Sequence, residues 1–179
     1  MKSGKLAAFI AFLLTQVLFL PCIAAQQKPT PASGAGTHAE TRLALREGWT
    51  LHIVLDTSGS MANVLPKVLG AIASFCDGAG VSQIHILQCD IEVTRDEWLE
   101  PAQLAEYRIA GFGGSDMSPG LLQLVEDTEV SAVLVLTDGY IDYPAAEPPY
   151  RVLWAVFRSP DGYDSTFRPA YGEVIFLDP

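Results

Sequence analysis

Apolar runs that alternate with helical patterns constrain the fold of this chain more than any other feature of its sequence. Five runs have the length and composition of buried strands, at 51–55, 84–89, 130–136, 152–157 and 174–177. Residues 65–76 and 118–125 instead carry apolar side chains at helical spacing. Near-continuous apolar strands separated by helices are typical of a parallel sheet that helices cover on both faces. The sequence therefore predicts an α/β fold of three layers, with a doubly wound, mostly parallel sheet in the middle.

Proline and glycine residues predict where the first helix begins and ends. Pro66 fits the first turn, where its missing amide hydrogen is no loss, and Gly78 and Gly80 are expected to stop the helix. The segment 91–98 mixes charged with apolar residues, so we expect an edge strand with one face in water.

The first 25 residues have the organisation of a secretory signal peptide. Two lysines precede an apolar run at 6–20, and small residues follow at 22–25. We expect cleavage after Ala24 or Ala25, which predicts a protein exported to the periplasm or secreted. An uncleaved anchor facing the periplasm is the alternative, because residues 6–25 are uncharged and about 20 such residues span a bilayer.

Residues 26–46 are predicted to form a flexible linker, because they are rich in Pro, Gly, Ser and Thr and show no apolar periodicity. The folded domain is then expected at 47–179. Within it, Cys76 and Cys89 fall near opposite ends of the predicted sheet. A disulfide needs alpha carbons about 4.4 to 6.8 Å apart, so we expect two separate buried thiols.

The charge of the chain excludes two classes of partner. It has 11 basic and 21 acidic residues, a net charge of −10, and removal of two lysines with the signal peptide leaves 9 minus 21, or −12. Such a charge repels phosphates, so neither nucleic acid nor an anionic lipid surface is expected to bind. Membrane contact is expected only through an uncleaved anchor.

Three polar clusters lie at strand ends or beside them, where open parallel sheets bind ligands. They are Asp56-Thr57-Ser58-Gly59-Ser60, Gly113-Gly114-Ser115-Asp116 and Thr137-Asp138-Gly139. In an extended loop alternate side chains project to one side, so the oxygens of Asp56, Ser58 and Ser60 are expected to converge.

The clusters contain the ligands of a hard cation. Mg²⁺ takes about six oxygens and usually keeps several waters. Ser58, Ser60 and Ser115 can supply neutral hydroxyls, while Asp56 and Asp138 can hold coordinated waters without touching the ion. Hydroxyls and water neutralise the metal poorly, so we expect an acidic side chain of a protein partner to complete the coordination.

These clusters resemble the metal-ion-dependent adhesion site of von Willebrand factor type A (VWA) domains. Asp56, Ser58 and Ser60 match its Asp-x-Ser-x-Ser element, Ser115 takes the place of its second-loop Thr, and Asp138 corresponds to its third-loop Asp. The resemblance implies a Rossmann-like fold and Mg²⁺ or Mn²⁺ bound by these five residues.

The segments 136–140, 142–144, 149–154 and 172–175 further resemble the carboxyl-terminal VWA-like domain of a bacterial family classed as predicted metallopeptidases. This resemblance covers residues 47–179 and describes a short version of the fold. The sequence has no His-Glu-x-x-His, and its three histidines are isolated, so peptidase activity is not expected.

Structural interpretations compete with the metal site at each cluster. Asp56 and the serines after it could cap the next helix, but one cap needs one such residue and three alternate here. Ser115 and Asp138 lie in turn sequences, and we interpret them as ligands because the clusters occur together. Asp116 could replace Ser115 as the ligand, but we expect it to brace its loop, and we expect Asp142 to be structural.

The remaining polar and aromatic residues are assigned to core or surface. Five are expected in the core, namely His52, His85, Trp98, Tyr150 and Trp154. Three are expected on the solvated surface, namely Glu97, Glu100 and Glu106.

The leading hypothesis for function is an exported, non-enzymatic module that uses Mg²⁺ or Mn²⁺ to hold an Asp or Glu of a protein partner. A metal-dependent hydrolase is the second hypothesis, since a bound ion can activate water. Against it, the sequence offers no evident general base and no Gly-x-Ser-x-Gly element. The third hypothesis is a metal-free scaffold domain.

Overall fold

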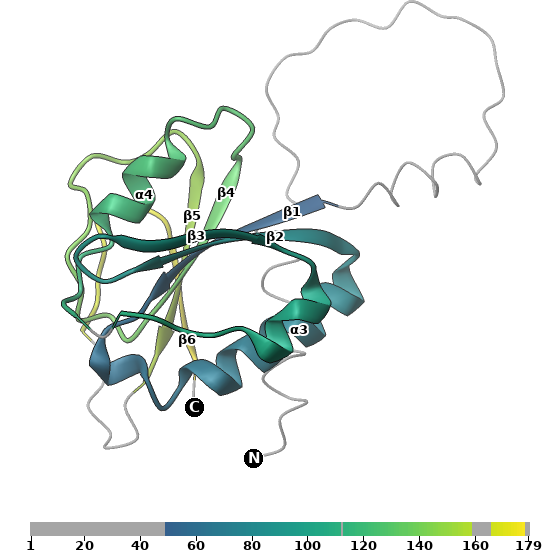
Figure 1. Cartoon of the computed structure of the whole chain (residues 1–179). Helices are drawn as coiled ribbons and strands as arrows, with labels where there is room; N and C mark the ends of the chain where they lie inside the picture. The colour runs from purple at the N-terminus through teal and green to yellow at the C-terminus, as the bar shows by residue number, and fades with distance from the viewer. Residues whose placement is uncertain (1–48, 112, 159–165, 178–179) are drawn as a thin grey trace, which may run out of the picture.

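One six-stranded sheet organises the fold (Figure 1), in a computed structural model that describes residues 49–111, 113–158 and 166–177. Its strands are β1 (Trp49–Asp56), β2 (Val81–Cys89), β3 (Val93–Leu99), β4 (Ala132–Thr137), β5 (Arg151–Phe157) and β6 (Glu173–Leu177). They lie in the order β3-β2-β1-β4-β5-β6, and within this sheet only β3 pairs antiparallel. The mostly parallel sheet and its edge strand after β2 are therefore confirmed.

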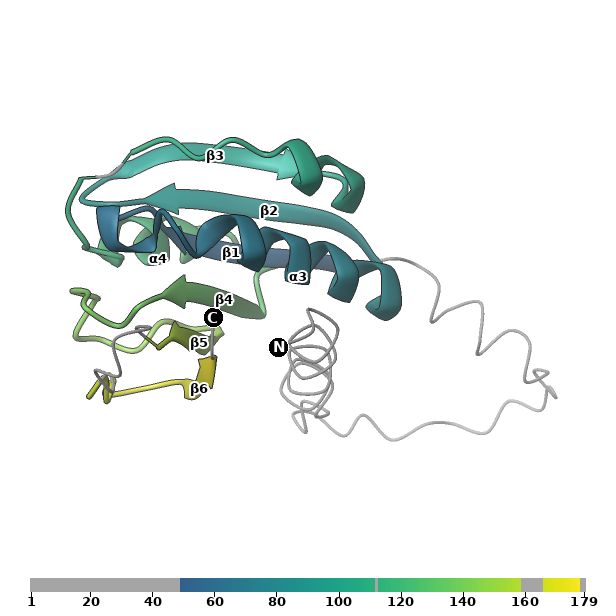
Figure 2. The ribbon, with the colours of Figure 1, turned by 90° about the horizontal axis from the view of Figure 1, so that it is seen from below.

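Helices cover both faces of this sheet, as predicted. Helix α3 (Leu65–Ala79) runs along one face and the shorter α4 (Ser118–Leu124) lies on the other (Figure 2). Two 3₁₀ turns, Gly59–Met61 and Pro101–Glu106, complete the described helical elements. The predicted signal peptide at 1–25 and linker at 26–46 lie outside the described residues. Within the described ranges, no helix combines the length and apolar character needed to cross a membrane.

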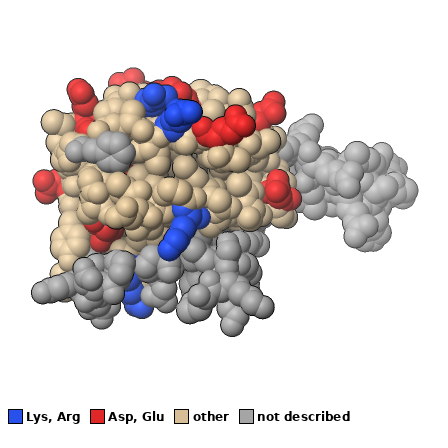
Figure 3. Space-filling model, turned by 60° about the horizontal axis from the view of Figure 1, so that its bottom comes forward, with Lys and Arg blue, Asp and Glu red and all other residues tan. Residues whose placement is uncertain are grey.

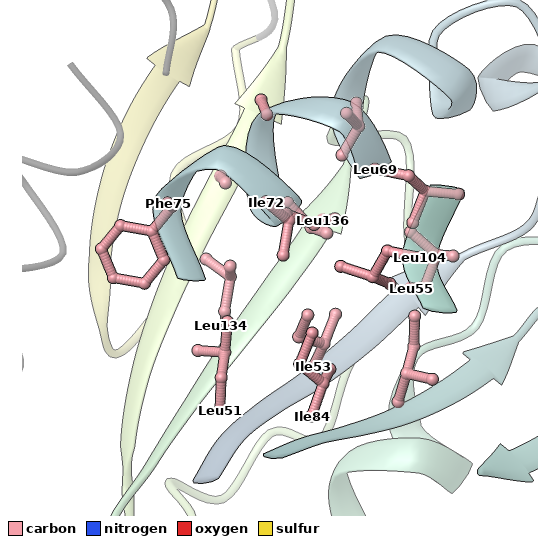
Figure 4. Packing of buried hydrophobic residues seen from close by; sticks show 14 of the residues in the cluster. Leu51, Ile53, Leu55, Leu69, Ile72, Phe75, Ile84, Leu104, Leu134 and Leu136 are labelled. Carbon is pink, nitrogen blue, oxygen red and sulfur yellow. The ribbon is translucent and has the colours of Figure 1, made fainter. Parts of the chain in front are cut away.

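The core on the α3 face follows from alternation along β1. Leu51, Ile53 and Leu55 point to this face and pack against Ile72 and other apolar residues of α3 (Figure 4). Leu104 of the second 3₁₀ turn belongs to the same cluster. The residues of β1 that alternate with these three point to the opposite face of the sheet, so this strand contributes side chains to the core on both faces.

The limits of α3 agree only in part with the sequence prediction. Pro66 lies in the first turn, and Gly80 ends the helix in a left-handed conformation with φ of 71°. Gly78, expected to stop the helix, instead lies inside it. The correction has a simple reason: a glycine inside a helix costs only about 1 kcal/mol relative to alanine, and burial of Phe75 and Cys76 holds this turn in place.

The α4 face contains the second core cluster. Trp154 and Tyr150 are buried there, as predicted. Gly120 lets α4 approach the sheet closely, because a β-carbon at this position would lie 3.1 Å from Val54 Cγ1. Cys89 belongs to the core cluster on the α4 face, whereas Cys76 belongs to the core cluster on the α3 face. Both thiols are buried and free, as predicted.

Two histidines, one on β1 and one on β2, form a hydrogen-bonded pair on the α4 face of the sheet. His52 Nδ1 and His85 Nδ1 lie 3.2 Å apart, and His85 Nε2 lies 2.8 Å from Asp96 Oδ1. Asp96 Oδ2 also accepts a 2.6 Å hydrogen bond from Gln123 of α4. Both histidines are buried and hydrogen-bonded, which confirms their assignment to the core.

Two assignments on the edge strand were wrong. Trp98 stacks on the His85 ring at 4.1 Å but stays 49% exposed, because β3 is the sheet edge and α4 is too short to cover it. Glu97, expected on the solvated surface, is half-buried. Glu100 and Glu106 are exposed, as predicted.

The pKa of His52 predicts how the stability of the fold depends on pH. Burial lowers this pKa below its ordinary value of 6.5, and His85 lowers it further, while Asp127 opposes the change. The unfolded chain therefore takes up a proton at a pH where the folded state still holds His52 neutral. We expect the free energy of unfolding to decrease as the pH falls from about 7.5 to about 5.5.

The control is His52→Asn, which keeps a donor near His85 but does not titrate. Denaturant unfolding of both proteins at the two pH values measures the effect. The wild type should lose more stability than the variant. Equal losses in both proteins would show that His52 is not the titrating group.

Candidate metal site

The topology brings the first and third polar clusters together. From β1 the chain passes to β2 on one side and later to β4 on the other, so the strand order reverses between β1 and β4. Leu55 pairs with Leu136, which places the next residues, Asp56 and Thr137, at adjacent strand ends. Thr137 Oγ1 donates a 2.7 Å hydrogen bond to Asp56 Oδ2. The point of reversal, where such sheets bind ligands, therefore carries a carboxylate.

Asp56 is fully buried and oriented by two hydrogen bonds. Its Oδ2 accepts from Thr137 and its Oδ1 accepts from the Ser58 N–H at 2.9 Å. Burial raises the pKa of Asp56 above its ordinary value, and the Asp138 carboxylate adds to the rise, although the two hydrogen bonds oppose it. A cation nearby would stabilise the ionised form that burial disfavours.

Ser58 and Ser60 form a pair of adjacent hydroxyls after Asp56. Their Oγ atoms lie 3.1 Å apart, with Ser58 buried and Ser60 exposed. The Met61 N–H donates to the Ser58 carbonyl at 3.0 Å and closes the turn that holds this spacing. Neither that turn nor α3 has a side-chain cap, so these residues do not serve as caps.

The second and third loops are joined through their backbones. The Asp142 N–H donates to the Ser115 carbonyl, and the Met117 N–H donates to the Asp142 carbonyl, both at 2.8 Å. Asp116 Oδ1 accepts from the Ser118 N–H at 2.8 Å, so it braces its loop as predicted. Asp142 acts here through its backbone, which agrees with a structural role.

The structure groups the predicted ligands unequally. Asp56, Ser58 and Ser60 are linked by hydrogen bonds, and Asp138 is close enough to Asp56 to influence its pKa. Asp138 Oδ1 accepts from the Tyr140 N–H at 3.0 Å. Within the described residues, the Ser115 hydroxyl makes no hydrogen bond to the first loop, and this half-buried side chain is joined to the site only through its loop.

The sequence analysis missed Asp90, which directly follows β2. Its side chain is buried, Oδ1 accepts from the Ile91 N–H at 2.5 Å, and Oδ2 accepts from the Gly113 N–H at 3.2 Å. Its carbonyl also accepts from the Asp116 N–H. Asp90 thus attaches the second loop to the end of β2. Its position after a buried strand, like that of Asp56, was the available signal.

Glycines allow the second loop to lie directly on its neighbours. A β-carbon at Gly111 would lie 2.7 Å from Thr57 Oγ1, and one at Gly113 would lie 2.6 Å from Asp90 Oδ2. Gly111 also has φ of +113°, which disfavours any other residue. The close approach therefore requires glycine at both positions.

The available donors suit a hard cation better than zinc. Among the described residues, no group of three His, Cys, Asp or Glu side chains is arranged to hold a metal. The grouped atoms are hydroxyl and carboxylate oxygens, which fit an ion that retains water, whereas structural zinc takes four ligands rich in Cys and His. Ser58 and Ser60 are the residues that could contact such an ion, and Asp56 is the residue that could hold its water.

Comparison with known proteins identifies a family. The family model described as VWA-like domain (DUF2201) matches residues 51–178. No curated protein matches the chain at a significant level.

The contact between Gly113 and Asp90 predicts the effect of adding one methyl group. Gly113→Ala places its β-carbon against the Asp90 carboxylate, so we expect a loss of about 1–3 kcal/mol in the free energy of unfolding. The matched control is Gly78→Ala in α3, where a β-carbon meets nothing within 4 Å. That change should stabilise the protein by up to about 1 kcal/mol. Urea unfolding compares them, and equal stability of the two variants would contradict the contact.

The raised pKa of Asp56 predicts that the carboxylate lowers stability when no metal is present. When folding raises the pKa of an acid, the free energy of unfolding decreases as the pH rises from the unfolded-state pKa to the folded-state pKa. In chelator, we expect Asp56→Asn to unfold at a higher temperature than wild type at about pH 7, with the difference shrinking towards about pH 4. The exposed Asp142→Asn serves as control. A lower melting temperature for Asp56→Asn at about pH 7 would refute this expectation.

Proposed function

The chain belongs to the family of VWA-like domains, and from this premise we propose that it is an exported module that binds a protein partner through a divalent cation. The observation that carries the proposal is the Asp56 carboxylate at the point of strand-order reversal. It is fully buried, oriented by Thr137, and followed by the paired hydroxyls of Ser58 and Ser60.

In this proposal the ion is Mg²⁺ or Mn²⁺. Ser58, Ser60 and Ser115 supply hydroxyl ligands, and Asp56 and Asp138 hold water bound to the ion. Support comes from Asp56, because its two hydrogen bonds fix its orientation while leaving further lone pairs on both oxygens. The cation also offsets the cost of the buried negative charge.

The partner in this proposal presents an Asp or Glu side chain. A metal shell of hydroxyls and water leaves the ion electrophilic, and a carboxylate from outside completes it. Without the ion, the carboxylates of Asp56, Asp90 and Asp138 would repel such a partner. The cation is therefore expected to switch the site from repelling an acidic side chain to binding it.

We propose a binding role rather than a hydrolytic one because neither of the described histidines adjoins the site, where it could take a proton from water. The histidines that are described, His52 and His85, are hydrogen-bonded to each other within the sheet. The same proposal includes export through residues 1–25, a linker at 26–46 and a folded domain at 47–179. It also includes a relation to the VWA-like domain of predicted bacterial metallopeptidases, but not their peptidase activity.

Metal titration tests the proposal. After stripping with chelator, the purified protein should bind Mg²⁺ or Mn²⁺ in calorimetry and gain thermal stability, because the ion binds only the folded state. The double variant Asp56→Ala, Ser58→Ala should lose at least about tenfold in affinity, equivalent to about 1.4 kcal/mol.

The control variant Asp142→Asn removes one exposed carboxylate from the joined loops without removing a proposed ligand. It should keep wild-type affinity for the metal. The absence of heat and of a thermal shift in the wild type, up to millimolar metal, would reject the metal-binding function and favour a metal-free scaffold.

A further inference from the structure

Two large apolar side chains lie exposed beside the candidate metal site. Ile91 directly follows Asp90 at the end of β2 and is 66% exposed. Tyr140 comes three residues after the end of β4 and is 62% exposed. Isolated exposed apolar residues are common on protein surfaces. These two residues differ from such isolated cases because both lie in the loops next to the candidate metal site.

The sheet order places one apolar side chain on each side of the first loop. β1, which leads into Asp56, Ser58 and Ser60, lies between β2 and β4. Adjacent strands are about 4.8 Å apart, so the ends of β2 and β4 are separated by about 10 Å. Ile91 follows the first of these ends and Tyr140 the second, which places the proposed ion between them.

Both residues also adjoin the loops that carry Ser115 and Asp138. A β-carbon at Gly114 would lie 2.5 Å from Ile91 Cγ2, so Ile91 rests on the backbone next to Ser115. The Tyr140 N–H donates to Asp138 Oδ1 at 3.0 Å. The Ile91 side chain therefore lies against the second loop beside Ser115, and the Tyr140 backbone adjoins Asp138.

Local hydrogen bonds hold these exposed residues in place. The Ile91 N–H donates to Asp90 Oδ1 at 2.5 Å. Tyr140 follows Gly139, which has φ of 85° and donates its N–H to Thr137 Oγ1 at 3.0 Å. The backbone at both positions is thus tied to residues of the site loops.

The surrounding charge indicates what kind of partner these side chains fit. The segments 56–66, 89–94 and 109–150, which include the site loops together with α4 and β4, contain no lysine or arginine, although they contain Asp56, Asp90, Asp116 and Asp138. Figure 3 shows acidic side chains spread around the outline of that view rather than gathered into one patch, with a few basic side chains among them. Apart from the ion, the site therefore offers an acidic partner no attraction between charges, and apolar contacts must supply the rest of the binding.

We propose that Ile91 and Tyr140 select a partner segment in which the metal-binding Asp or Glu has a large apolar residue on each side. This inference rests on the proposed function, because it describes the partner of the same site. In an extended segment, residues two positions before and after the acid point to the same side as the acid. They lie about 13 Å apart, which the isoleucine and tyrosine side chains can span from strand ends about 10 Å apart.

Two synthetic peptides test the inference by fluorescence anisotropy. One contains Leu-Ala-Asp-Ala-Leu and the other Ser-Ala-Asp-Ala-Ser, each within the same flanking Gly-Ser sequence. With Mn²⁺ present, the leucine peptide should bind the wild-type protein at least tenfold more tightly than the serine peptide. Chelator, or replacement of the peptide Asp by Asn, should abolish binding of both.

The double variant Ile91→Ser, Tyr140→Ser should bring the two peptide affinities within about twofold while leaving its affinity for Mn²⁺ unchanged. The matched control is Leu122→Ser on α4, a 56% exposed apolar residue on a helix rather than on the site loops, which should keep the tenfold preference. Equal binding of the two peptides by the wild type, binding of neither, or a preference that survives the double substitution would overturn the inference. Absence of Mn²⁺ binding by the wild type would instead refute the proposed function, and the inference with it.

Discussion

The hydrogen bond from Thr137 to Asp56 is the interaction on which the candidate site depends. It joins the ends of β1 and β4, the two central strands between which the order of the sheet reverses. Because Asp56 is buried, its carboxylate would be costly without this donor and the Ser58 N–H. The same two bonds set the direction of the chain as it leaves β1, and so fix where the hydroxyls of Ser58 and Ser60 lie.

Most of the fold could be predicted because local patterns and tertiary packing agree along this chain. Each apolar run became a strand, and Pro66 and Gly80 delimit α3. The incorrect predictions concern residues whose conformation or exposure depends on packing against other parts of the structure. Gly78 stays helical because packing around it outweighs its weak propensity. Trp98 has the composition of a core residue, but its exposure depends on the length of α4, which a single strand cannot reveal.

The sequence could suggest the candidate site only in part. Extended alternation was expected over residues 56–60, but Ser60 lies in the 3₁₀ turn Gly59–Met61, and this turn, rather than alternation, brings its hydroxyl within 3.1 Å of Ser58 Oγ. Asp90 was missed because its role depends on contacts with Gly113, distant in sequence, and its own neighbourhood resembles an ordinary strand end. The position of the Ser115 loop likewise depends on backbone hydrogen bonds to Asp90 and Asp142, which are distant in sequence and which no local pattern encodes.

The backbone bonds of Asp142 have a mechanical consequence. Since Asp142 bonds both Ser115 and Met117, the second and third loops are joined to each other and to the residue that precedes α4. Near the other end of that helix, Gln123 donates a hydrogen bond to Asp96 on the edge strand β3. These contacts connect the third loop, through α4, to the edge of the sheet. A shift of the third loop is therefore expected to move α4 and to load its contact with β3.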